Sequence, residues 1–325
     1  MSKKNIIKAL NEALREEMLR DDSVYITGED VGRWGSIYTV TKGLFEEFGP
    51  ERVIDMPICE NLISCMPIGM ALMGMRPVVE IMFADFAMLQ YDGIANQAAK
   101  MHFVSNGANT CPIVYRAAQG AGGGNSSQHS QCIESWFMNI PGLIIISPSD
   151  AYDAKGLLKS AIRNDNPILF LEHKTMYAET CDVPDEEYTI PIGKARILQE
   201  GKDVTLIANQ KMLKFAKEAI ERLEKEGKNI SVELIDPRTI KPYDADAFCA
   251  SASKTGRVII VHENCLTGGY AGEFAFAIQE RCLNDLKKPI KRIAALDSSL
   301  PAGKMDMYCL PDVDEIYQAI VDIMN

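Results

Sequence analysis

Residues 143–174 read LIIISPSDAYDAKGLLKSAIRNDNPILFLEHK, and this stretch decides the fold class. It begins with an apolar run at residues 143–146 and closes on a second one at residues 168–171. Between the runs, a helical pattern begins at Ser149 or Asp150, either of which can cap it, and ends in an Asn-Asp-Asn-Pro turn. Two short buried strands joined by a helix predict parallel pairing in a sheet.

The same alternation of strands and helices occupies the whole first half of the chain. Further strand-like runs lie at residues 24–27, 77–80 and 113–116. An amphipathic helix is expected at the N-terminus, with apolar side chains at helical spacing from Ile6 to Met18. We therefore expect residues 1–176 to form an α/β domain with a parallel sheet between helices.

A second, smaller α/β domain is expected at residues 202–325. Residues 177–201 are polar, contain prolines and show weak periodicity, so they are interpreted as the linker. After them, strands are expected at residues 204–208, 231–235 and 258–262, and helices at residues 211–226 and 313–324.

Composition excludes several classes of protein. The net charge of −11 and the lack of a basic cluster disfavour nucleic acid as a partner. The most apolar stretch, residues 62–75, is broken by Pro67 and is too short to cross a membrane, and no signal peptide is recognised. The nine cysteines include no CxxC pair, so neither a disulfide framework nor a zinc site is expected. We expect a cytoplasmic protein.

Two short segments could carry chemistry. The only Gly-rich loop, residues 120–125, leads to His129-Ser130-Gln131; taken alone, it would be a flexible turn with an exposed histidine. Glu60 stands directly before a long apolar helix rich in small residues, where an isolated glutamate is most often a helix cap. No phosphate loop, dinucleotide fingerprint, HExxH or GxSxG motif is present.

Taken together and in order, these segments resemble the β chains of thiamine-diphosphate-dependent 2-oxoacid or acetoin dehydrogenases, within the transketolase-like superfamily. The resemblance covers nearly the whole chain, through Glu60, residues 80–86 and the loop that ends at Gln131, and on through residues 160–163, 172–174, 235–242, 261–263 and 267–269. It implies a pyrimidine-binding domain at residues 1–176 and a transketolase C-terminal-like domain at residues 202–325.

The resemblance also implies roles for individual residues. Glu60 matches the carboxylate that binds a ring nitrogen of the aminopyrimidine and so stabilises the imino tautomer that activates the cofactor. Ile58, Met82 and Phe86 match its apolar bed, although core packing would otherwise explain Met82 and Phe86. His129 matches a histidine at the mouth of the site that positions substrate or moves protons during transfer to the lipoyl group.

The superfamily holds Mg²⁺ and the diphosphate with a Gly-Asp-Gly segment followed by Asn, and this chain has none. The resemblance therefore implies an α subunit that holds Mg²⁺, an α2β2 heterotetramer, and transfer of an acyl group to a lipoyl-bearing dihydrolipoyl acyltransferase core. It further implies a monovalent cation such as K⁺, bound by main-chain oxygens. The residues implied are Ile113, Ala161, Ile162, Asn164 and Asn166. A plain helix end with an Asn-rich turn explains the same stretch equally well.

Two other functions remain open at this point: half of a split transketolase, and a structural subunit whose site has decayed. Departures from the family pattern at Met56, Gly93 and Asn209, and in residues 296–301, blur the subfamily. Residues 172–174 favour acetoin or pyruvate over branched-chain substrates, but the sequence does not identify the substrate.

Overall fold

The stretch that decides the fold class forms the strand–helix–strand unit that its pattern predicts. In the computed structural model, which describes residues 1–325, strand β6 (Ile144–Ile146) and strand β7 (Ile168–His173) pair in parallel, joined by helix α6 (Ala151–Ile162). The N-cap of α6 is Asp150, whose carboxylate accepts from the backbone N–H of Asp153 at 2.8 Å. Of the two residues that could cap this helix, Asp150 is the one that does.

β6 and β7 belong to a seven-stranded sheet with the order β12-β6-β7-β5-β4-β2-β3. All neighbours pair in parallel except β12, which is antiparallel to β6. The other strands are β2 (Val24–Gly28), β3 (Val53–Asp55), β4 (Arg76–Ile81), β5 (Val114–Gln119) and β12 (Thr239–Lys241). The expected parallel α/β domain is confirmed.

Helices cover both faces of this sheet, as its apolar strands require. On one face, α1 (Ile6–Arg20) packs beside α6, and their apolar sides share a core with alternate residues of β2, β4, β5 and β7. On the other face lie α3 (Glu60–Leu72), α5 (Glu134–Met138) and a run of short helical turns between Ala84 and Val104. The remaining helix of this domain is α2 (Leu44–Phe48), near β3.

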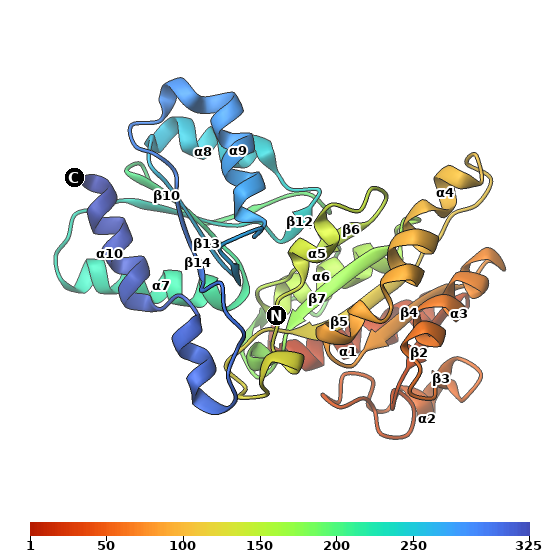
Figure 1. The fold of residues 1–325 in the computed structure, drawn as a ribbon. Helices are drawn as coiled ribbons and strands as arrows, with labels where there is room; N and C mark the ends of the chain where they lie inside the picture. The colour runs from red at the N-terminus through yellow and green to blue at the C-terminus, as the bar shows by residue number, and fades with distance from the viewer.

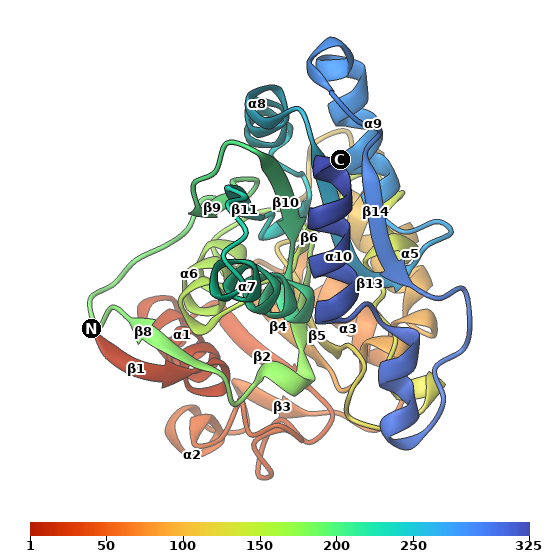
Figure 2. The ribbon, with the colours of Figure 1, turned by 90° about the vertical axis from the view of Figure 1, so that its left-hand side faces the viewer.

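The second domain is built on a five-stranded sheet with the order β14-β13-β10-β11-β9 (Figures 1 and 2). Only β9 runs antiparallel to its neighbour. Helices α7 and α10 cover one face, and α8 and α9 the other. The bounds are β9 (Arg196–Gln199), β10 (Val204–Ala208), α7 (Gln210–Lys225), β11 (Val232–Asp236), α8 (Ala245–Thr255), β13 (Val258–Cys265), α9 (Ala271–Cys282), β14 (Lys291–Ala295) and α10 (Val313–Met324).

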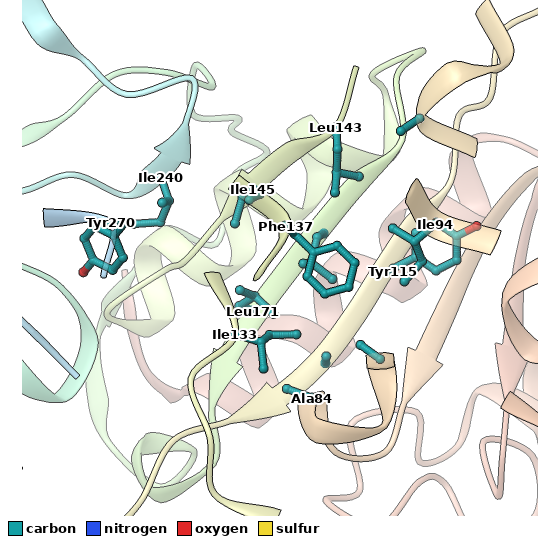
Figure 3. Packing of buried hydrophobic residues seen from close by; sticks show 14 of the residues in the cluster. Ala84, Ile94, Tyr115, Ile133, Phe137, Leu143, Ile145, Leu171, Ile240 and Tyr270 are labelled. Carbon is teal, nitrogen blue, oxygen red and sulfur yellow. The ribbon is translucent and has the colours of Figure 1, made fainter. Parts of the chain in front are cut away.

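The two domains share one hydrophobic core. Ile240 of β12 and Tyr270, which precedes α9, belong to the same buried cluster as Phe137 and Ile145 of the first domain (Figure 3). Because β12 also extends the first sheet, the second domain is attached by both backbone pairing and apolar burial. This attachment fixes how the second domain meets the loops of the first.

Residues 177–201, interpreted as a linker, contain two short strands. β8 (Thr180–Val183) pairs antiparallel with β1 (Ser2–Asn5), beside α1 in Figure 2, and β9 forms an edge of the second sheet. Each of these strands has only four residues and is partly exposed, so neither produces a clear apolar alternation in the sequence. None of the helices in the structure combines the length and apolar character needed to reach across a bilayer.

Candidate active site

Glu60 is the first residue of α3, and it does not cap the helix. The N-cap is Cys59, which makes no side-chain capping bond. The half-buried carboxylate of Glu60 accepts no hydrogen bond within the chain. Its position in the first turn is favourable for an anion, because the free N–H groups of a helix start carry partial positive charge. Glu60 is therefore an available acceptor.

One pocket brings Glu60 together with Met82 and Phe86, as the resemblance implies. Met82 directly follows β4, and Phe86 lies on the short 3-10 helix after it (Ala84–Met88). All three side chains are half-buried. The pocket's lining is completed by Glu29, Ile63, Glu80, Ile81 and Gln90. The cavity itself is only about 10 Å³, far below the ~300 Å³ at which small-molecule sites begin, so the chain alone forms only part of a site.

His129 ends the Gly-rich loop, on a single 3-10 turn (Ser127–His129), and lies against the aromatic edge of the pocket. Its ring meets those of Phe83 at 4.8 Å and Phe86 at 5.3 Å between centroids, both nearly perpendicular. Because Phe86 lines the pocket together with Glu60, His129 contacts a ring that belongs to the lining of the pocket. Ile58 does not line the pocket and is 74 % exposed, so its place in the apolar bed stays a prediction.

Glu29 is a site residue that the sequence analysis missed. It follows β2 and lines the pocket with Glu60. Burial, the charge of Asp30 and the charge of Glu60 together raise its pKa. The only signal in the sequence is an acidic residue at the carboxyl end of a predicted strand, where parallel sheets gather their ligands.

Behind the pocket, a buried guanidinium holds two further carboxylates. Arg116 of β5 donates to both oxygens of Glu172 at 2.7 and 2.8 Å and to Glu80 at 3.0 Å, and Tyr177 also donates to Glu172 at 2.7 Å. Burial raises the pKa of Glu80, and Arg116 opposes that rise. Glu80 is the member of this cluster that lines the pocket.

The other histidines and residues 172–174 lie away from the pocket. His102 is exposed and contacts the carbonyl of Asn109, while His262 is fully buried. His173 is buried and pairs with Glu263. Residues 172–174 are all buried and engaged inside the protein, and none lines the pocket. The inference that this segment favours acetoin or pyruvate therefore has no support in the geometry of the pocket.

The residues expected to bind a monovalent cation lie at the end of α6, with Ile113 just before β5. Arg76 of β4 donates to the carbonyls of Ile162 at 2.8 Å and Asn164 at 2.7 Å. The carbonyls of Ile113 and Ala161 accept from backbone N–H groups. Each carbonyl has a second lone pair, so the cation site stays a prediction. No group of three or more His, Cys, Asp or Glu side chains is arranged to hold a metal ion.

Two family models match the chain. The model described as "Transketolase, pyrimidine binding domain" matches residues 2–180, and "Transketolase, C-terminal domain" matches residues 193–316. The pocket with Glu60, Met82 and Phe86 lies entirely within the first match.

Curated relatives cover almost the full length. The chain is 45 % identical to the 2-oxoisovalerate dehydrogenase subunit beta of Bacillus subtilis, over 99 % of both chains. It is 42 % identical to pyruvate dehydrogenase E1 component subunit beta-2 of Oryza sativa subsp. japonica, over 96 % of this chain and 84 % of that one. The E1 component subunit beta of Rickettsia felis is 40 % identical over 96 % of each.

Solved structures share the fold at lower identity. An inactive β4 tetramer of a split-gene transketolase superposes with a TM-score of 0.78 at 21 % identity, covering 98 % of each chain. Transketolase from Leishmania mexicana gives 0.72 at 13 % identity; the match covers all of this chain and 46 % of that one. At these identities the likeness concerns the fold alone.

Proposed function

This chain belongs to the family of E1 β subunits of 2-oxoacid dehydrogenases, and from that premise we propose that it supplies the pyrimidine half of a thiamine-diphosphate site. In the proposed reaction, a 2-oxoacid is decarboxylated, or acetoin is cleaved, and the acyl group passes to a lipoyl arm. The observation that carries this proposal is the pocket in which Glu60, Met82 and Phe86 meet, with His129 at its aromatic edge.

The residues of the pocket fit an aminopyrimidine. Glu60 is a carboxylate without a partner, placed to accept a hydrogen bond from a ring nitrogen. Phe86 and Met82 offer apolar surface to the faces of the ring. When bound, the cofactor supplies a nucleophilic carbon that adds to the 2-oxo group. It also accepts the electron pair that stays behind when carbon dioxide leaves. Glu60 holds the aminopyrimidine in the tautomer that this chemistry needs.

His129 contacts the aromatic ring of Phe86, which lines the pocket. Its ring is half-buried, and its edge contacts with Phe83 and Phe86 fix the direction in which it points. An imidazole titrates close to neutral pH, so it can both give and take a proton. We assign His129 to positioning substrate and to moving a proton during transfer to the lipoyl group.

The other half of the site, with Mg²⁺ and the diphosphate, belongs to an α subunit in an α2β2 heterotetramer. Exposed apolar side chains between residues 58 and 103 support a protein partner: Ile58 and Met73 flank α3, Met88 ends the following 3-10 helix, and Phe103 on α4 (Met101–Val104) is 88 % exposed. Such side chains mark protein interfaces when several occur on one region of a chain. A dihydrolipoyl acyltransferase core would then receive the acyl group.

A split transketolase and a decayed subunit are less well supported. The split-gene transketolase is 21 % identical, whereas dehydrogenase β subunits reach 45 % over the full length. A decayed site would be expected to lose its functional side chains, and this chain keeps Glu60, Met82 and Phe86 together in one pocket.

Replacing Glu60 by Gln in the reconstituted heterotetramer tests the proposal. The amide keeps the shape but replaces the anion at the ring nitrogen, so we expect turnover to fall about 10²- to 10³-fold. The melting temperature should hold, because Glu60 makes no bond within the chain. Steady-state turnover and thermal denaturation are the two measurements.

The matched control is Glu51→Gln, a nearby exposed glutamate outside the pocket, which should leave both quantities unchanged. A Glu60→Gln enzyme with normal turnover and a lowered melting temperature would show that Glu60 only stabilises the helix start, and the proposed role would be wrong.

A further inference from the structure

Successive peptide groups of the Gly-rich loop are hydrogen-bonded by lysine and carboxylate side chains that do not line the pocket. Two consecutive peptide units, Gly120–Ala121 and Ala121–Gly122, each have a lysine at the carbonyl and a carboxylate at the N–H. Three of the four side chains come from the second domain, which contributes no residue to the pocket of Glu60.

The first peptide lies between Lys174 and Glu263. The ammonium group of Lys174 donates to the carbonyl of Gly120, and the N–H of Ala121 donates to Glu263 at 2.6 Å. The other oxygen of Glu263 meets Nε2 of His173 at 2.8 Å. Burial alone would raise the pKa of Glu263, but its contacts with His173, Lys211 and the Ala121 amide outweigh burial and lower it to about 2. Glu263 is therefore an anion at neutral pH.

The second peptide lies between Lys211 and Asp306. Lys211, at the start of α7, donates to the carbonyl of Ala121 at 3.0 Å. Asp306 is fully buried on the 3-10 helix Gly303–Cys309, and one of its oxygens accepts from the N–H of Gly122 at 2.7 Å and of Gly124 at 3.1 Å. Hydrogen bonds to an ionised partner are about twice as strong as neutral ones, so each peptide plane is held firmly.

Glycine at two positions of the loop is required by this arrangement. Gly120 and Gly122 have φ of +94° and +92°, which side chains rarely adopt. A Cβ on Gly120 would lie 2.2 Å from Nε2 of His173, and one on Gly122 would lie 2.1 Å from the ammonium group of Lys211. These two positions are glycine because the side chains of His173 and Lys211 approach the backbone of the loop closely.

Further hydrogen bonds attach the rest of the loop, as far as the turn that carries His129. The N–H of Gly303 donates to the carbonyl of Gly124 at 3.1 Å, and the hydroxyl of Ser127 donates to the carbonyl of Leu300 at 2.6 Å. Beyond the turn, the side-chain amide of Gln131 donates to Asp85 at 2.7 Å. The turn of His129 is thus attached to the second domain on one side and to the 3-10 helix that carries Phe86 on the other.

We propose that Lys174, Glu263, Lys211 and Asp306 form an ionic clamp that positions His129, so that the second domain controls the reactivity of a site it does not line. This inference rests on the proposed function for the role of His129, but the clamp itself is a property of the chain. The four are positioning residues and do not touch substrate.

Amide hydrogen exchange on the full chain tests the clamp without any reaction. Asp306→Asn keeps the size of the side chain but removes the charge that accepts two N–H groups. Loss of hydrogen bonds to a charged group should speed exchange in residues 120–128 by about ten- to a hundredfold. The control Asp285→Asn, which changes an exposed carboxylate without a hydrogen-bond partner in the same domain, should leave the loop unchanged.

A double-mutant cycle in the heterotetramer tests the positioning role. Asp306→Asn should lower kcat by about tenfold or more with little change in the apparent affinity for the cofactor. In a His129→Ala background, the same substitution should have less than about a twofold effect, because the residue through which it acts is gone. Lys211→Met removes the hydrogen bond to the carbonyl of the same peptide and should give the same pattern. It takes the place of Asp306→Asn if that variant fails to fold.

Unchanged exchange in folded Asp306→Asn would show that the loop does not depend on the clamp and would overturn the proposal. So would faster exchange with full kcat, or equal losses in both backgrounds. If the wild-type heterotetramer turned over no 2-oxoacid or acetoin, the proposed function would fail, and the exchange rates would still decide whether the clamp holds the loop.

Discussion

Glu60 and Glu80 line the same pocket and are treated by the protein in opposite ways. Glu80 extends from β4 into the protein, is 8 % exposed, and has the guanidinium of Arg116 at 3.0 Å. Glu60 stands at the start of α3, half-buried, with no hydrogen bond from the chain. One carboxylate has its partner built in, and the other has none.

The difference shows which carboxylate supports the fold and which awaits a ligand. A buried charge is tolerated only with a partner, so Glu80 and Glu172 depend on Arg116 for their burial. A carboxylate left free beside an aromatic ring and a methionine has no structural purpose that the chain reveals, which is why the functional role is assigned to Glu60.

The largest effect on stability is expected for Arg116→Leu. This change leaves Glu80 and Glu172 buried without their cation, and removing one partner of a buried ion pair typically costs about 3 to 5 kcal/mol. Urea denaturation of the full chain measures the free energy of unfolding. Lys214→Ala, which breaks a pair with Glu179 that is 47 % exposed on both sides, is the control and should cost less than about 1 kcal/mol. Equal losses of unfolding free energy in the two variants would show that Glu80 does not depend on Arg116. The contrast between Glu80 and Glu60 would then disappear.

A smaller effect on stability is expected from His262, which is fully buried and has no hydrogen-bond partner. Both ring nitrogens lack hydrogen bonds, and burial, with a lesser effect of Arg292, lowers the pKa to about 3. The unfolded imidazole binds a proton below about pH 6.5, so the free energy of unfolding falls as the pH drops from there toward 3. Between pH 7.5 and 5, His262 should account for a loss of about 2 kcal/mol.

His262→Leu should remove this part of the pH dependence. Glu263, whose pKa is lowered to about 2, contributes stability that is lost only below about pH 4.5, outside this range. The other three histidines are common to both proteins and cancel in the comparison. Urea denaturation at both pH values gives the result, and identical pH dependence in wild type and variant would show that His262 is not held neutral in the fold.

The sequence predicts the regular elements well where a single period dominates. Strand β10 and helix α10 have the residue bounds expected from their apolar patterns, and α6 begins at one of its two candidate caps. Strand β12 was missed because it is three residues long and pairs with β6, nearly a hundred positions away. Pairing at that distance leaves no local periodicity to detect.

The site was only partly predictable. Glu60, Met82, Phe86 and His129 were found through a family resemblance, and the structure places the first three in one pocket and His129 against the ring of Phe86. Asp306 and Glu29 were missed, because an acidic residue at the end of a strand or in a loop looks like any solvated charge. The departure at Asn209, directly after β10, was noted in the sequence, but its structural consequence was not predicted. Gln210 takes φ +46° there, and its side chain bonds Gln119 and the carbonyl of Leu171.

A chain that holds half of a cofactor site should depend on its partner to bind the cofactor, and calorimetric titration of thiamine diphosphate in the presence of Mg²⁺ measures this. We expect no tight stoichiometric binding by the chain alone, because its pocket offers groups for the aminopyrimidine only, and we expect stoichiometric binding once the α subunit is present. Tight one-to-one binding by the chain alone would contradict the split site.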